Sequence, residues 1–332
     1  MAVPIGAIAV SARSLAPDLA RGAMLLLIAL ANAHLYLYER PVGVRGYPVP
    51  ESIRDQAVVL LQMTFVDGRA YPMFAFLFGY GIVQLWRRHT SKGADEGAVR
   101  KIIRRRGRWM ILFGFLHALL LFSGDIIGAY GVLAVVLAGL LVRVSDRQLL
   151  IMVGLWTVLI VGYGALQGLP QPDGTVSLLP SMSITDPLVA AVWRVNEWVV
   201  LTIVLSLISL VPALLLGALA ARRRLLDEPE RHRRLLVGVA VLGVGLAAIG
   251  GLPMALMAAL WSPDQPVVAT VLAGVVHTVT GYAGGVGYAA IAGLVAIRVR
   301  NRARRGPVLS ALAACGQRSM TCYLLQSVVF VA

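Results

Sequence analysis

The residues best suited to chemistry are a histidine and an aspartate in one segment, residues 104–130. His117 lies inside an apolar run, and Asp125 follows eight residues later in a polar turn. Eight residues are a little over two helical turns, so both side chains share a face if the helix persists to the turn. A carboxylate that holds one tautomer of a histidine makes it a usable general base. The alternative is that His117 only forms a hydrogen bond between helices.

Other ionisable side chains also interrupt apolar stretches. Asp67 and Arg69 lie two residues apart in one stretch, and His34 lies near the end of another. Charges are costly in lipid unless they face protein or water, so we predict a polar cavity that opens at one face and reaches the midplane. His34, Asp67 and Arg69 are therefore further catalytic candidates. The other residues expected to line the cavity are Asn32, Tyr130, His277 and Tyr282.

Metal and nucleotide sites are not predicted. The five histidines lie on separate segments without an HxxxH or ExxH pattern, and Cys315 and Cys322 are too few for a thiolate site. The glycine-rich runs lack the GKS or GKT ending of a nucleotide-binding loop. We therefore expect no metal and no tightly bound cofactor.

The composition is that of a polytopic membrane protein. Of the 332 residues 58% are hydrophobic and only 14% are charged, whereas about 25% charged residues is usual in soluble domains. The net charge of +14 would indicate nucleic acid in a soluble protein, but here basic residues form short clusters between apolar runs. We expect one integral membrane domain over residues 1–332, with the lipid bilayer and not nucleic acid as its surroundings.

The apolar runs predict an all-α bundle of nine transmembrane segments. Their approximate bounds are 15–38, 56–86, 105–122, 125–142, 148–166, 197–220, 235–260, 267–297 and 319–332. The second is too long for one span and contains Gly68 and Pro72, so we expect a broken or kinked helix there. The last would rise only about 21 Å, short of the roughly 30 Å core, which predicts a truncated C-terminus and a tenth helix in the natural protein.

The basic clusters also predict the orientation. Lys and Arg concentrate in residues 87–108, 222–234 and 298–305, which fall on one side of the alternating segments. Cytoplasmic loops carry such an excess, so we expect a cytoplasmic N-terminus in a bacterial inner membrane. The largest external segment, 167–196, either caps an outer cavity or serves as a linker. The glycines of segments 235–260 and 267–297 indicate either close helix packing or a narrow passage for a substrate tail.

Four blocks of the chain resemble signatures of the YeiB-like bacterial membrane proteins, a family of uncharacterised function. They are RSLAPDLARGAMLLLIALANAH, YPMFAFLFGYG, RRGRWMILFGFLHALLLFSGDIIGAYG and GQRSMTCYLLQS, in that order. The opening block, with Asp18, Arg21 and Gly22, is also distantly similar to transmembrane acyltransferases, including the heparan-α-glucosaminide N-acetyltransferases.

This resemblance implies transfer of an acyl group from cytoplasmic acyl-CoA to a small-molecule, glycan or lipid acceptor at the outer face. It also implies a working histidine in the region of His34. On that hypothesis acyl-CoA is a co-substrate whose phosphates bind basic residues at the inner face. The residues expected there are Asp18, Arg21, Arg104, Arg105 and Arg318.

Purely structural roles are also compatible with the same residues. Asp18 and Arg21, spaced i, i+3, can be a structural ion pair, and the basic loops can simply set topology. Two other functions also fit the sequence. One is a transporter or permease for a small organic solute, and the other is a non-catalytic partner of membrane proteins. A homo-oligomer is compatible with all three.

Overall fold

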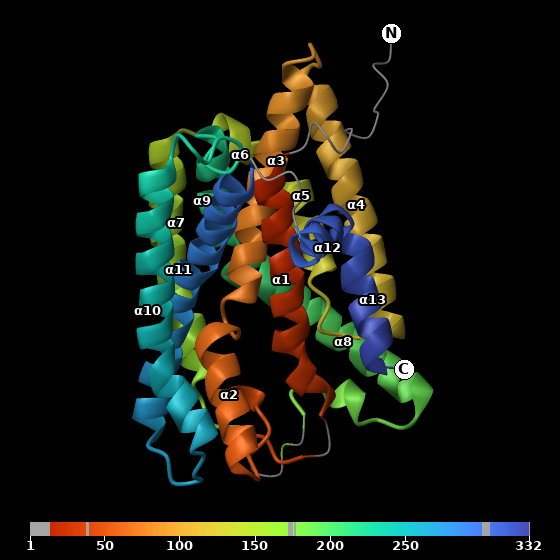
Figure 1. Ribbon diagram of the computed structural model, residues 1–332. Coiled ribbons are helices and arrows are strands. Elements are labelled where there is room, and N and C mark those ends of the chain that lie inside the picture. Colours follow the sequence, from red (N-terminus) through yellow and green to blue (C-terminus); the bar gives the residue numbers. More distant parts are fainter. Residues whose placement is uncertain (1–13, 38–39, 172–174, 176, 301–305, 332) are drawn as a thin grey trace.

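The computed structural model describes residues 14–37, 40–171, 175, 177–300 and 306–331, and over these residues the chain is an all-α bundle (Figure 1). The described part contains no β-strand, only an isolated bridge between Val42 and Pro48. Five helical stretches are long and apolar enough to cross a membrane: Leu15–Tyr36, Asp146–Gln167, Pro187–Ser209, Arg233–Ala259 and Val267–Val299. The predicted class, a helical membrane bundle, is confirmed.

The α-helices follow one another along the described residues. They are α1 (Leu15–Ala33), α2 (Ile53–Phe65), α3 (Ala70–Thr90), α4 (Glu96–Leu120), α5 (Ile127–Leu137), α6 (Leu140–Arg143), α7 (Asp146–Gln167), α8 (Pro187–Val204), α9 (Val211–Arg222), α10 (Arg233–Ala259), α11 (Val267–Val299), α12 (Pro307–Gln317) and α13 (Ser319–Val331).

Three boundaries differ from the sequence-based prediction. The single segment expected at 197–220 is divided into α8 and α9 by a π-helical turn, Leu205–Ser209. Helix α8 already begins at Pro187, where the Asp186 side chain accepts hydrogen bonds from the backbone N–H groups of Leu188 and Val189. The loop is therefore shorter than the predicted external segment 167–196, because Asp186 and Pro187 form a helix start. Helix α12 was not predicted, since it is too short to span a membrane.

The predicted break in the second segment is confirmed. Helix α2 ends at Phe65 and α3 starts at Ala70, with Gly68 between them at φ +71°. That left-handed conformation is readily adopted by glycine, and a Cβ there would lie 2.9 Å from Cε1 of His277. The break therefore brings α11 close to the unwound backbone.

Glycines let several helix pairs approach at backbone distance. A Cβ on Gly217 of α9 would lie 1.8 Å from the carbonyl oxygen of Phe76 in α3, and one on Gly79 would lie 2.0 Å from that of Leu214. On α10, a Cβ on Gly243 would lie 2.4 Å from the Ala283 carbonyl of α11. The packing interpretation of the glycine-rich segments is thus supported, because these contacts leave no room for side chains.

The turns fall at two opposite ends of the bundle. The α3–α4 turn and α6 lie at the upper end of Figure 1, and the α10–α11 turn and the start of α2 lie at the lower end. The cluster of arginines at the α3–α4 end and the few arginines near α2 are thus separated by the length of the helices.

Candidate functional site

The centre of the site is a buried chain of three side chains. His117 Nδ1 lies 2.9 Å from Asp125 Oδ1, and His117 Nε2 lies 2.8 Å from Ser327 Oγ. The exposed fractions are 3% for His117, 0% for Asp125 and 5% for Ser327. We call these three residues the relay. The contact expected between His117 and Asp125 is present, and Ser327 adds a hydroxyl on the opposite ring nitrogen.

Three different elements position the relay. His117 lies in the last turn of α4, Asp125 in the α4–α5 connection and Ser327 in α13. Asp125 Oδ2 accepts a hydrogen bond of 2.7 Å from the backbone N–H of Gly128 at the start of α5. A Cβ on Gly114 would lie 2.4 Å from the same oxygen, so glycine at that position makes room for the carboxylate. The Asp125 side chain therefore has one orientation.

With Asp125 ionised, the relay distances allow one arrangement of protons. An ionised carboxylate only accepts hydrogen bonds, so Nδ1 of His117 carries a proton and donates it to Asp125. The other nitrogen, Nε2, is then free to accept from the Ser327 hydroxyl. A histidine in this arrangement can take the proton of the hydroxyl while the carboxylate stabilises the imidazolium that forms. The same order of groups activates serine nucleophiles in acyl-transfer enzymes on unrelated folds.

A cavity of about 400 Å³ adjoins the relay, and we call it the outer cavity. Phe122, Gly124 and Ile126, which flank Asp125, form part of its wall together with Tyr323, one turn before Ser327. The ring of Tyr323 lies 5.3 Å from that of His117. Its hydroxyl accepts a hydrogen bond of 3.3 Å from the Ile126 backbone. Tyr323 thus stands between the outer cavity and His117.

The opposite wall of the outer cavity is ionic. Arg45 and Asp67 both line it and are paired, with 2.8 Å between Arg45 Nε and Asp67 Oδ2. Arg69 is fully buried behind them and bonds His277 Nε2 at 2.6 Å, the Ala247 carbonyl at 2.6 Å, and the Asp67 carbonyl. Asp67 and Arg69, the residues predicted at the break, therefore do lie together, and their partners come from α10, from α11 and from the loop before α2.

The other predicted cavity residues divide into two groups. His34 and Asn32 line the outer cavity, and the His34 ring stacks on Tyr47 with 4.0 Å between centroids. Tyr130 and Tyr282 are buried among helices instead, with hydroxyls bonded to the backbone carbonyls of Tyr71 and Ser209. His34 thus faces the cavity and stays apart from the relay.

A second cavity of about 320 Å³ lies between α1, α3, α4, α5 and α13, and we call it the inner cavity. Arg21, Arg106 and Ser319 contribute its polar groups, while Phe74 and Phe78 are among its apolar walls. Tyr323 lines this cavity as well as the outer one. Tyr323 therefore borders both the basic cavity and the ionic one.

Of the residues predicted to bind acyl-CoA, Arg21 alone lines the inner cavity. Asp18 is 3.4 Å from Arg21 and orients it. Arg104, Arg105 and Arg318 are exposed nearby on α4 and at the α12–α13 junction, and Arg104 donates to the Val135 carbonyl at 3.0 Å. Arg106, and not Arg104 or Arg105, lines the inner cavity.

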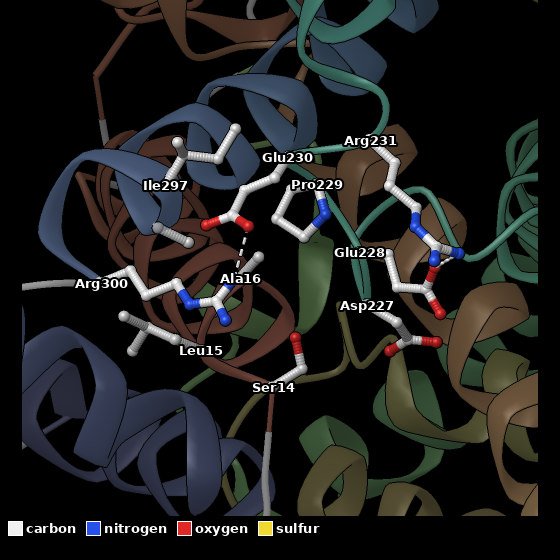
Figure 2. Close-up of a pocket in the computed structure, with 11 residues that line it drawn as sticks. Ser14, Leu15, Ala16, Asp227, Glu228, Pro229, Glu230, Arg231, Ile297 and Arg300 are labelled. Carbon is white, nitrogen blue, oxygen red and sulfur yellow. Dashed lines mark hydrogen bonds and ion pairs between the residues drawn. The ribbon is translucent and has the colours of Figure 1, made fainter.

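A third cavity, of about 640 Å³, lies at the α9–α10 loop against the start of α1 and the end of α11 (Figure 2). Its acidic side chains are engaged in ion pairs, with Glu230 2.5 Å from Arg300 and Glu228 2.7 Å from Arg231. A hydrogen bond from Arg224 lowers the pKa of Glu228 below its usual value. These pairs order the loop and leave no carboxylate there for chemistry.

No group of three His, Cys, Asp or Glu side chains that could hold a metal occurs among the described residues. The relay and the ionic wall are hydrogen-bonded sets in which each histidine nitrogen that contacts a side chain already faces a carboxylate, a guanidinium or a hydroxyl. The arrangement can transfer a proton between Ser327 Oγ and His117 Nε2 beside the outer cavity.

Residues 220–332 match a family described as a protein of unknown function, DUF418. The chain is also similar to the uncharacterized protein YxaH of Bacillus subtilis (strain 168), with 29% identity over 221 residues. That match covers 58% of this chain and 53% of YxaH, so the chain spans about half the length of this curated relative. No solved structure matches. A family of unknown function agrees with the expected resemblance to uncharacterised bacterial membrane proteins, and neither name assigns an activity.

Sequence reasoning missed three residues of the site. Ser327 belongs to the block GQRSMTCYLLQS, but its partner His117 becomes evident only in the structure, where α13 meets α4. Arg45 was not among the predicted site residues, and Tyr323 stood in the same block without a predicted role. The one available signal was His117 itself, because a buried imidazole needs a partner on each ring nitrogen.

Proposed function

We propose that the protein is a membrane-embedded acyltransferase that uses the relay to move an acyl group from acyl-CoA to an acceptor. The observation that carries the proposal is the hydroxyl–imidazole–carboxylate chain of Ser327, His117 and Asp125. Buried groups with this order and these distances activate a hydroxyl for attack on a carbonyl carbon.

The reaction has two balanced halves. In the first, Ser327 Oγ attacks the thioester carbonyl while His117 Nε2 takes its proton, and the carbon–sulfur bond breaks. The thiolate of coenzyme A leaves with the proton from His117, and the acyl group is an ester on Ser327. In the second, His117 takes a proton from the acceptor hydroxyl, whose oxygen attacks the ester, and Ser327 regains the proton. The sum is acyl-CoA plus acceptor giving acylated acceptor plus free coenzyme A.

The two cavities supply the two substrates in this proposal. Acyl-CoA enters the inner cavity, where Arg21 and Arg106 attract phosphate groups and apolar walls accept the pantetheine and acyl chain. The acceptor enters the outer cavity. Tyr323 lies between the two, one turn from Ser327 on the same helix. The orientation that follows from the basic loops puts acyl-CoA on the cytoplasmic side of a bacterial inner membrane.

Labelled acetyl-CoA tests the first half without knowledge of the acceptor. We expect the purified wild-type protein to release about one equivalent of free thiol in a burst and to carry label on the peptide 319–331. Ser327→Ala and His117→Ala should abolish both, whereas the exposed control Ser91→Ala should keep both. Full burst and labelling in Ser327→Ala would reject the serine ester, and their retention in His117→Ala would reject the relay.

A transporter of a small organic solute is the second candidate, and the broken helix favours it. Unwound backbone beside a paired Arg45 and Asp67 at a cavity is a feature of helices that bind transported solutes. Proton-driven uptake by proteoliposomes that is lost in Asp67→Asn would support this function. A third alternative, a non-catalytic partner of membrane proteins, gives the relay no purpose.

A further inference from the structure

We infer that the ionic wall of the outer cavity binds an anionic group, a phosphate ester or a carboxylate, of a small hydroxyl-bearing molecule. In the acyltransferase this molecule is the acceptor, so that assignment rests on the proposed function. The binding itself does not. The inference depends on Arg45, on the charge balance of the wall, and on the start of α3.

Arg45 presents an unused donor at the cavity. Its side chain is 6% exposed and lines the cavity, and its Nε is held by Asp67 Oδ2 at 2.8 Å. One of its two terminal nitrogens, Nη1, is buried and has no hydrogen-bond partner among the described residues. A guanidinium has five donors in a rigid fork, so fixing Nε also fixes the direction of Nη1. A buried charged donor without a partner is costly, and an anion in the cavity would satisfy it.

The wall also carries more positive than negative charge. Arg45 and Arg69 are two guanidiniums, and Asp67 is their one carboxylate. The other groups that Arg69 contacts are the Ala247 carbonyl and His277 Nε2. His277 Nε2 also lies 3.1 Å from the Met63 carbonyl oxygen and 3.6 Å from Asp67 Oδ2. Whichever ring nitrogen carries the proton, the His277 ring adds no negative charge. One positive charge in a buried setting is left without a counter-ion.

The start of α3 adds to this positive region. Gly68, Ala70 and Tyr71 line the outer cavity, and they belong to the break and the first turn of α3. N–H groups in a first helical turn have no partner within the helix, and the helix dipole makes that end positive. A broken helix that points its N-terminus into a cavity at membrane depth is a recurrent site for anionic substrate groups.

The far wall indicates what the rest of the ligand is. Phe122, Ile126 and Tyr323 are apolar or aromatic and adjoin the relay. A ligand held by its anion at Arg45 would therefore extend toward Ser327 with its uncharged part. A volume of about 400 Å³ suits a molecule of the size of a glycerol phosphate or a hydroxy acid.

Calorimetric titration of the protein in phosphatidylcholine nanodiscs, without acyl-CoA, tests the inference. The ligands are glycerol 1-phosphate, inorganic phosphate and uncharged glycerol. We expect the two phosphates to bind and glycerol not to. Arg45→Gln should weaken phosphate binding about tenfold or more, the cost of one charge-assisted contact, whereas Asp67→Asn should keep or tighten it. The matched control Arg54→Gln removes an exposed charge at the same end and should have no effect.

Arg45→Gln and Asp67→Asn together distinguish an anion site from a structural ion pair. Both variants break the pair, so a structural role predicts equal effects on phosphate binding. Equal effects would overturn the inference. Equal binding of glycerol and glycerol 1-phosphate by the wild-type protein would overturn it too. If Arg45→Gln does not fold, Arg45→Lys keeps the charge but loses the fork, and intermediate affinity is expected.

Nanodiscs that contain phosphatidylglycerol identify the source of the anion. Competition with glycerol 1-phosphate there would assign a lipid headgroup, and unchanged affinity would assign a soluble molecule. Since no acyl-CoA is present, phosphate binding without any acyl transfer would leave this inference standing while the acyltransferase proposal fails. Acyl transfer by a protein that does not prefer the phosphates to glycerol would support the acyltransferase proposal and overturn this inference.

Discussion

Asp125 uses its two carboxylate oxygens for different purposes. One oxygen faces His117 Nδ1, and the other accepts from the Gly128 backbone and lies 3.5 Å from the Trp198 indole nitrogen. Both are acceptor roles, and the residue is completely buried. An asparagine has one acceptor oxygen and one donor nitrogen, so it cannot serve both sides.

Asp125→Asn should therefore disable the relay with little change of shape. We expect initial rates of acyl transfer to fall by about 10²- to 10⁴-fold, because the imidazole loses its orientation and its stabilising charge. The measurement is the thiol-release rate with acetyl-CoA. Asp264→Asn, an exposed aspartate in the α10–α11 turn, is the matched control. A rate within about twofold of the control would show that Asp125 has only a packing role.

At the scale of elements, α3 and α9 pack through reciprocal glycines. Each helix presents a glycine to a carbonyl oxygen of the other. A Cβ added to Gly217 would lie 1.8 Å from the oxygen that it faces, and one added to Gly79 would lie 2.0 Å from the oxygen that it faces. Such distances mean that the backbones touch, which is the usual basis of helix association in lipid. The break that carries Asp67 and Arg69 leads directly into α3, so this contact also positions the site.

Gly217→Ala should separate α3 from α9. The added methyl would meet the Phe76 carbonyl, and we expect a loss of about 1–3 kcal/mol in stability and a lower Tm in detergent. Gly154→Ala is the control, since a Cβ there has nothing within 4 Å. Its expected effect is neutral or stabilising by about 0.5–1 kcal/mol, because alanine favours a helix. Equal Tm values for the two variants would contradict close packing at α3–α9.

The break between α2 and α3 has a matched test of its own. Gly68 and Gly93 both adopt positive φ, +71° and +82°, but a Cβ on Gly68 would press on His277 while one on Gly93 meets nothing within 4 Å. Both alanine variants should pay about 1–2 kcal/mol of backbone strain. Gly68→Ala should have the lower Tm, and it alone should weaken phosphate binding by displacing His277 and Arg69. Equal effects would mean that the His277 contact contributes nothing.

At the scale of the whole molecule, charge is distributed unequally between the two ends of the bundle. Residues 87–108 carry nine Lys and Arg side chains at the α3–α4 end, and the α10–α11 turn at the other end carries none. A bilayer around the apolar helices would separate these two ends. The asymmetry predicts that the α3–α4 end is cytoplasmic.

Cysteine labelling in intact cells tests that orientation. In a background with Cys315→Ala and Cys322→Ala, a membrane-impermeant maleimide should label Asp264→Cys and not Ser91→Cys. Both positions are exposed, at opposite ends of the bundle. Permeabilised cells should allow both to react, which controls for reactivity. Labelling of Ser91→Cys alone in intact cells would reverse the proposed orientation.

Much of the fold follows from local patterns in the sequence. Apolar runs of the right length predicted the helices, and Gly68 with Pro72 predicted the break, because lipid imposes helices and both residues act on their own backbone. The His117–Asp125 contact was also predictable, since a short connection brings the two residues together. The helix boundary at 187 and helix α12 were not, because neither changes the apolar pattern that signals a span.

The sequence by itself determined the class of the protein, the broken helix and half of the relay, since these depend on residues near one another in the chain. Only the tertiary structure decided which distant residues complete the site. Ser327 reaches His117 across 210 positions, and Arg69 meets His277 across 208. Such pairs form only when helices pack, and packing is set by backbone approach at glycines spread over the whole chain. Arg45, which lines the outer cavity and has a buried donor without a partner among the described residues, likewise acquires its role only where its loop folds against the break.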